Sequence, residues 1–204
     1  PSTLSINLMC DLGTKGRRLY QEVSDQFVAD LEEGQITASN ALSRLLRLQQ
    51  ITSGYGRLED GTDVEIDSSK AKVLEDTLTD IGNEPVVVFT RFVHDLDVVH
   101  KVAAKVGVPS YEVSGRRKDL SEWTSGVLAV QIQAGGLGLD LTRARYAIYY
   151  SLGYSLGDYS QSMARLHRPG QSHPVEYIHI LASGTVDETV MEALARREAV
   201  VDHI

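Results

Sequence analysis

The sequence predicts an α/β protein: a mostly parallel sheet with helices on both faces and a helical N-terminal part. Three observations support this prediction. Several short segments, such as "PVVVFT" (85–90) and "VLAVQI" (127–132), are apolar throughout instead of alternating with polar residues. Segments with helical spacing separate them, and the first third of the chain carries two further helical patterns. Strands that are apolar on both sides are typical of a parallel sheet covered by helices on both faces.

The N-terminal part contains two of the expected helices. Residues 15–34 and 37–54 both carry apolar side chains three and four positions apart, and both end at a glycine, a common helix terminator. The polar stretch 55–69 contains glycines and predicts an exposed loop or a small excursion. We therefore divide the chain into a helical N-terminal segment, 1–67, and an α/β domain, 68–204.

From residue 70 the pattern alternates between helix and strand. Helices are expected over 70–81, 91–107, 119–126, 158–168 and 186–204, and strands over 85–90, 109–114, 127–132, 146–151 and 175–182. The last helix opens with "TVDE", in which Thr185 and Glu188 match a capping box. Helix capping therefore explains "VDET" (186–189) better than an acidic catalytic box does.

Composition and charge exclude several classes of protein. With 204 residues the chain can bury one substantial core, and a single cysteine, Cys10, excludes an intramolecular disulfide and suits a reducing cytoplasm. The six histidines show no ligand spacing, so we expect no metal site. A net charge of −8 argues against broad affinity for nucleic acid. No apolar run approaches the roughly 20 residues that span a bilayer, so no membrane association is expected.

A glycine-rich loop follows the strand-like segment "VLAV". In "QIQAGGLGLDLTRA" (131–144), Gly135, Gly136 and Gly138 allow tight turns and close approach of the backbone to a ligand. Asp140 supplies an acceptor suited to a ribose hydroxyl. Such a loop at the carboxyl end of a strand is compatible with a ligand site. Taken alone, however, glycines after a strand more often mark a crowded turn, and no Walker A motif occurs.

The stretch "DYSQSMARLHRPGQ" (158–171) is expected to be a short helix with two faces. Gln161, Arg165 and Arg168 share one face at 100° per residue, and the apolar face packs on the sheet. Guanidinium groups match phosphate oxygens with two parallel hydrogen bonds. In isolation this pattern is explained as well by helix-end chemistry, because Asp158 and Gln161 fit a capping box and the helix dipole favours a cation in the last turn.

The combination of segments carries a family resemblance. "VVVFT" (86–90), "QIQAGGLGLDLT" (131–142) and "QSMARLHRPGQ" (161–171) stand in the order and spacing of helicase motifs IV, V and VI. The chain resembles the C-terminal RecA-like lobe of superfamily 2 helicases of the Swi/Snf-type branch. The residues of its motifs resemble those of phage and bacterial members most. The resemblance covers nearly the whole chain. It departs from the pattern at Asp140, where many relatives have Asn, and at Pro169, which replaces a common Ile.

The resemblance implies the second motor lobe of an ATP-dependent DNA helicase or translocase. Arg165 and Arg168 are expected to reach the γ-phosphate of ATP, with Arg168 as the arginine finger and Gln161 beside the same phosphates. Gly138 and Asp140 are expected to face the nucleotide. ATP and its Mg²⁺ would be shared with a first RecA-like lobe, which would hold the metal. Since this chain has no Walker A motif and no acidic box, we expect it to be inactive in isolation.

The resemblance also implies a nucleic-acid surface, with duplex DNA expected over a single strand. Thr90 and Arg91 at the end of motif IV, together with Gly115 and Arg116, are expected to follow the phosphate backbone. A phage or bacterial member would act in the cytoplasm of a bacterial or phage-infected cell. Two other functions stay open: a non-catalytic helicase-like lobe that serves as a binding module, and an unrelated α/β enzyme that uses "AGGLG" as its phosphate loop.

Overall fold

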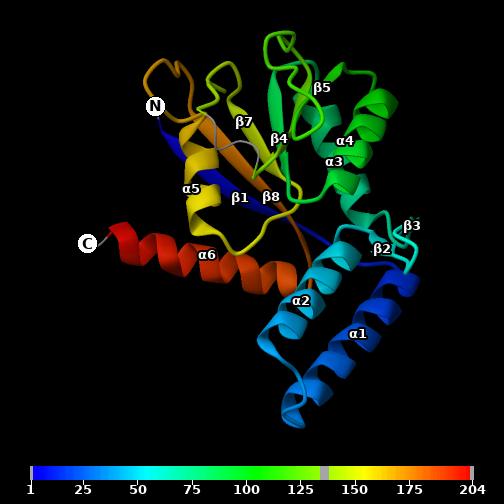
Figure 1. Ribbon diagram of the computed structural model, residues 1–204. Helices are drawn as coiled ribbons and strands as arrows, with labels where there is room; N and C mark the ends of the chain where they lie inside the picture. The colour runs from blue at the N-terminus through cyan, green and yellow to red at the C-terminus, as the bar shows by residue number, and fades with distance from the viewer. Residues whose placement is uncertain (1, 134–137, 203–204) are drawn as a thin grey trace.

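The computed structural model describes residues 2–133 and 138–202. Its centre is a six-stranded sheet of order β1-β8-β7-β4-β6-β5, in which every neighbouring pair is parallel. Helices cover both faces (Figure 1), which confirms the predicted fold class. The strands are β1 (Thr3–Cys10), β4 (Val86–Thr90), β5 (Ser110–Val113), β6 (Val127–Gln131), β7 (Tyr146–Tyr149) and β8 (Val175–Ala182).

The strands divide their side chains between two hydrophobic clusters, one on each face. Successive side chains of a strand point to opposite faces, so Val86 and Val88 of β4 enter one cluster while Val87 and Phe89 enter the other. The first cluster is covered by α3 (Ser69–Ile81) and α4 (Val93–Val106), and the second by α5 (Leu156–Ala164) and α6 (Val186–Asp202). Burial on both faces explains why the central strands are apolar throughout.

Strand β1 was not anticipated from the sequence. It pairs in parallel with β8 along its whole length, from Thr3 opposite Val175 to Cys10 opposite Ala182. As an edge strand it keeps most of its residues exposed or half-buried, and only Cys10 is fully buried. The expectation that the first third is helical is therefore wrong for these residues. The division at residue 67 stays a prediction, although β1 lies in the sheet that the later residues form.

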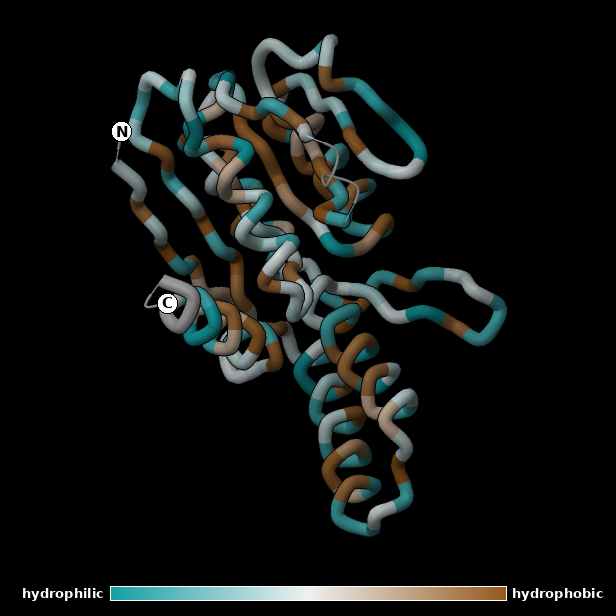
Figure 2. The backbone as a smooth tube through the Cα atoms, turned by 60° about the vertical axis from the view of Figure 1, so that its left-hand side comes forward, coloured by the Kyte–Doolittle hydropathy of each residue, from teal (hydrophilic) through white to brown (hydrophobic). Residues whose placement is uncertain are grey.

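The predicted N-terminal helices are present as α1 (Thr14–Glu32) and α2 (Ala38–Thr52). They lie side by side and project from the sheet as an arm (Figure 1). The Thr37 side chain caps α2 by accepting a hydrogen bond from the backbone N–H of Asn40. The predicted small excursion is a two-stranded antiparallel hairpin of β2 (Tyr55–Arg57) and β3 (Asp63–Glu65). Figure 2 shows this hairpin extending beside the arm, whose helices alternate hydrophilic and hydrophobic residues.

Two expected helices differ from the structure. Residues 119–126 form an irregular loop, in which the buried Trp123 ring is held by a hydrogen bond from its Nε1 to the carbonyl of Gly126. Helix α5 ends at Ala164 and so excludes Arg168. Pro169 has no N–H to donate to the carbonyl of Arg165 four residues earlier, and the N–H of Leu141 binds that carbonyl instead, at 3.0 Å. Among the described residues, no helix is both long and apolar enough to cross a membrane.

Candidate nucleotide and nucleic-acid site

The residues singled out from the sequence gather beyond the carboxyl ends of neighbouring strands. β7, β4 and β6 are adjacent in the sheet. The chain leads from β4 into Arg91, from β6 into the loop of Asp140, and from β7 into helix α5 with Gln161. Ligands in open parallel sheets bind at this edge, because the loops that follow the strands converge there.

A buried glutamine fastens the loop after β6 to the turn after α5. The side-chain amide of Gln171 donates to the carbonyls of Thr142, Ala144 and Leu166 at 3.2, 2.9 and 3.1 Å. Gln171 is 7% exposed, and its own carbonyl oxygen accepts from the N–H of His173. Together with the bond from Leu141 to Arg165, this amide holds the loop after β6 and the turn after α5 as one unit. The sequence places Gln171 at the end of the stretch 158–171 but carries no sign of this role.

Among the described residues of the stretch 158–171, Arg165 alone has a buried donor without a hydrogen-bond partner. Its Nε lies out of contact with solvent and has no hydrogen-bond partner. The side chain lines a small cavity with Gln161, Asp158 and Leu139, which joins α5 to the loop after β6. Gln161 and Arg168 are exposed. A buried guanidinium N–H without a partner is costly, so an oxygen acceptor placed in this cavity would stabilise it.

The described part of the glycine loop is shaped by a local turn. Gly138 has a φ of 72°, a conformation that favours glycine, and a Cβ added there would meet no atom within 4 Å. One oxygen of Asp140 accepts from the N–H and the hydroxyl of Thr142, at 3.0 and 2.7 Å. These hydrogen bonds, and then the charge of Arg168, lower the pKa of Asp140. Gly135 and Gly136 lie outside the described residues.

Arg91 at the end of β4 is half-buried and held from two sides. Its backbone N–H donates to the Ser151 hydroxyl at 2.8 Å, and its guanidinium donates to the side-chain carbonyl of Gln49 from α2. The same guanidinium lies over the ring of Phe92, 5.5 Å from its centre, and burial lowers the pKa of Arg91. Thr90 is fully buried. Its side chain therefore faces the core and does not share a surface with Arg91.

Arg116, after β5, is engaged by carboxylates. Its guanidinium binds both oxygens of the buried Glu112, at 2.9 and 3.0 Å, and Asp97 at 2.5 Å. Burial alone would raise the pKa of Glu112, but hydrogen bonds from Arg116, Ser114 and His100 lower it to about 2. Gly115 is exposed beside this cluster. Because β6 separates β5 from β4, Arg116 and Arg91 follow strands that are not adjacent.

Comparison with known proteins identifies the family of the chain. Residues 69–170 match the model of the helicase conserved C-terminal domain. Protein p41 of Acyrthosiphon pisum secondary endosymbiont phage 1 is 28% identical over 94% of this chain and 43% of its own length. An uncharacterized ATP-dependent helicase of Mycoplasma pneumoniae is 24% identical over 98% of this chain and 20% of its own. The chain thus spans less than half the length of these relatives.

Two solved structures share the fold. The C-terminal part of the Fun30 ATPase domain superposes with a TM-score of 0.74 at 15% identity, covering 95% of this chain and 89% of that one. The SWI2/SNF2 ATPase core of Sulfolobus solfataricus, solved in complex with double-stranded DNA, superposes with a TM-score of 0.73 at 21% identity. The match covers 98% of this chain and 45% of that one. The resemblance to a RecA-like C-terminal lobe is confirmed. The chain belongs to the family of helicase conserved C-terminal domains.

Proposed function

We propose that this chain is the second motor lobe of an ATP-dependent DNA helicase or translocase, and that it completes an ATP site whose other half lies on a first RecA-like lobe. The observation that supports this most directly is at Arg165: its buried Nε has no partner, and the residue lines a small cavity between α5 and the loop after β6. Names of the relatives include ATP-dependent helicases from Mycoplasma species.

The donor set suits a nucleotide phosphate. Arg165 and Arg168 would bind the γ-phosphate, since a guanidinium offers two parallel N–H groups to phosphate oxygens. Gln161 lines the same cavity as Arg165 and would contact the phosphates. Gly138 and Asp140 would face the sugar and backbone of the nucleotide. ATP supplies the phosphoanhydride bond whose hydrolysis powers a motor, and the first lobe would hold its Mg²⁺.

DNA is the proposed track, and its backbone would pass the ends of β4 and β5. Arg91 is the stronger candidate for a phosphate contact, because the carbonyl of Gln49 and the ring of Phe92 hold its guanidinium without neutralising it. Arg116 would have to exchange Glu112 or Asp97 for a phosphate. Gly115 lies exposed next to it, while Thr90 would act by positioning Arg91 from the core.

Alanine substitution in the parent protein tests the arginine roles. Arg168→Ala and Arg165→Ala should each lower kcat for DNA-stimulated ATP hydrolysis by about 10³-fold, as removal of an arginine finger does, with unchanged circular dichroism. Arg18→Ala, at an exposed position of α1, is the matched control and should leave kcat unchanged. Near-normal turnover of both variants would show that these arginines have a structural role and do not act in ATP hydrolysis.

The alternative, a lobe that only docks partners, makes a different prediction for the first lobe in isolation. If this lobe takes part in catalysis, the isolated chain should not hydrolyse ATP, whereas the parent with both lobes should. ATP hydrolysis by a purified first lobe alone, at the rate of the parent, would favour a docking module. Rapid hydrolysis by this chain alone would instead favour an independent nucleotide enzyme.

A further inference from the structure

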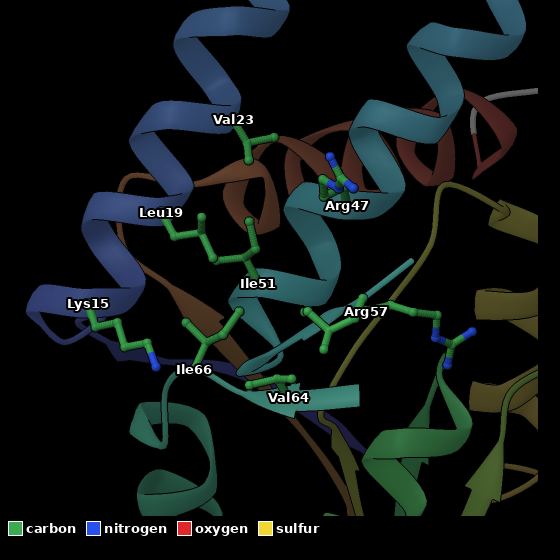
Figure 3. Close-up of a pocket in the computed structure, with 10 residues that line it drawn as sticks. Lys15, Leu19, Val23, Arg47, Ile51, Arg57, Val64 and Ile66 are labelled. Atoms are coloured by element: carbon green, nitrogen blue, oxygen red, sulfur yellow. The ribbon is translucent and has the colours of Figure 1, made fainter. Parts of the chain in front are cut away.

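An open apolar groove lies between the two helices of the arm, α1 and α2, and the β2–β3 hairpin. Figure 3 shows that side chains from both helices and from the hairpin segment line it. Its volume is about 410 Å³. The apolar side chains that line it are Leu19, Val23, Ile51, Leu58, Val64 and Ile66. Leu58 and Val64 are 53% and 37% exposed, so the hairpin presents an uncovered apolar side. None of the residues proposed to bind nucleotide or DNA lines this groove.

The groove is held in shape from below. Tyr55, at the base of the hairpin, is 1% exposed, and its ring stacks on His94 with ring centres 3.9 Å apart. The N–H of Ile66 donates to the carbonyl of Gly54 at 2.7 Å, closing the hairpin base. A Cβ at Gly56 would lie only 2.8 Å from Cδ1 of Ile66, so the Ile66 side chain packs directly over Gly56. A preformed groove binds with a smaller loss of conformational entropy.

The rim of the groove is positively charged although the chain carries a net charge of −8. Of the residues that the structure describes, Lys15, Arg47 and Arg57 are the charged ones that line it, and no acidic residue does. Arg57 is paired with Asp63, at 2.8 and 3.3 Å. Lys15 and Arg47 are exposed, and within the described ranges neither makes an ion pair or a side-chain hydrogen bond. Two free cations therefore flank an apolar floor.

We propose that this groove is a docking site for an acidic amphipathic segment of another protein. Apolar side chains of the segment fill the space between Leu19, Ile51 and Val64, while its carboxylates pair with Lys15 and Arg47. A nucleic-acid backbone fits less well, because it needs several clustered cations and gains nothing from an apolar floor. This inference is independent of the proposed motor function.

The test uses a synthetic peptide of about 15 residues, roughly four helical turns, with leucines at i, i+3, i+4 and i+7 and glutamates beside them. Titrated into the full 204-residue chain, it should bind with a micromolar Kd and shift the amide resonances of the groove. A matched peptide with lysines for glutamates should bind at least about tenfold more weakly. Failure of the acidic peptide to bind at about 1 mM, or equal binding of both peptides, overturns the proposal.

Substitutions locate the site and keep the test independent of folding. Arg47→Glu reverses an exposed charge on the rim and should weaken the acidic peptide by about tenfold or more. Arg18→Glu, on α1 but outside the groove, should have no effect. Val64→Glu, at an exposed hairpin position, should abolish binding with an unchanged thermal transition. Equal effects of the two arginine variants, or displacement of the peptide by duplex DNA or by self-association of the chain, would refute a protein-docking groove.

Discussion

A single side-chain amide joins the two loops of the proposed nucleotide site. Gln171 donates to three carbonyls, those of Thr142 and Ala144 in the segment before β7 and that of Leu166 after α5. The two N–H groups of this amide are shared among the three carbonyls, so without the amide these acceptors would lose their side-chain donor. Arg165 shares the same turn, so its placement depends on Gln171 as well as on α5. Gln171 is in this sense a positioning residue for Arg165.

Gln171→Glu removes the donors and retains the shape. A carboxylate in this place faces three carbonyl oxygens, so we expect the free energy of unfolding to fall by about 3 kcal/mol. Urea denaturation of the chain measures this change. Gln35→Glu, at an exposed position, is the control and should change stability by less than about 0.5 kcal/mol. A loss as small as that of the control would mean that the amide does not carry the junction.

The family resemblance identified Arg116 as a candidate for phosphate binding, but a resemblance in sequence does not reveal the partners of its side chain. The carboxylate of Glu112, four residues earlier and on a buried strand, binds that guanidinium at two points. A strand places residues i and i+4 on one face only while it continues, and the turn after Val113 decides where Arg116 points. The sequence therefore shows that an arginine follows this strand. It does not show the ion pairs of Arg116, because these depend on the conformation of an irregular turn.

At the scale of elements, His179 connects three parts of one sheet face. It lies on β8 and is fully buried. Its Nδ1 is 3.2 Å from the carbonyl of Ile6 on β1, and its Nε2 is 2.8 Å from the hydroxyl of Tyr159 on α5. A neutral imidazole suits both neighbours, donating to the carbonyl through Nδ1 and accepting from the hydroxyl at Nε2. Burial lowers the pKa of His179 to about 4, against an ordinary 6.5.

Acid should therefore weaken the fold through His179. Below pH 6.5 the unfolded chain takes up a proton that the folded chain refuses until about pH 4, so stability falls as pH falls between these values. The loss from this residue is about 3 kcal/mol at most. Urea unfolding at several pH values should show a flatter profile for His179→Gln than for the unaltered chain. Parallel profiles of the two proteins would contradict a titrating His179.

Fully buried elements could be predicted from the sequence, and edges and ends could not. β4 and β6 are apolar at nearly every position because both of their faces are covered. β1 has a partner on one side only and alternates weakly, which leaves it close to a loop in composition. α5 stops at Ala164 because its continuation binds the loop after β6, a long-range contact that helical spacing does not contain.

At the scale of the whole molecule, a buried ion pair connects the arm to the helices on both faces of the sheet. Nζ of Lys70 on α3 lies 2.9 Å from a carboxylate oxygen of Asp187 on α6 and donates to the carbonyl of Tyr150 at 2.8 Å. Asp187 also accepts from the hydroxyl of Thr52, the last residue of α2, at 2.8 Å, and from the N–H of Ala182 at 2.9 Å. The arm and both helix layers therefore share one carboxylate.

Because Asp187 connects these elements, we expect the arm and the sheet to unfold in one transition. Lys70 is 3% exposed, and Lys70→Met leaves Asp187 buried without its cation, which should lower the free energy of unfolding by about 3–5 kcal/mol. Lys72→Met on the same helix is the control, because Lys72 makes only exposed ion pairs and its substitution should cost less than about 1 kcal/mol.

Fluorescence of Trp123, the single tryptophan, reports the sheet, and far-ultraviolet circular dichroism reports the helices of arm and body. The two urea transitions should coincide in the unaltered chain and in Lys70→Met. A helical transition that precedes the fluorescence transition in the unaltered chain would show that the arm folds separately and that Asp187 does not join the two.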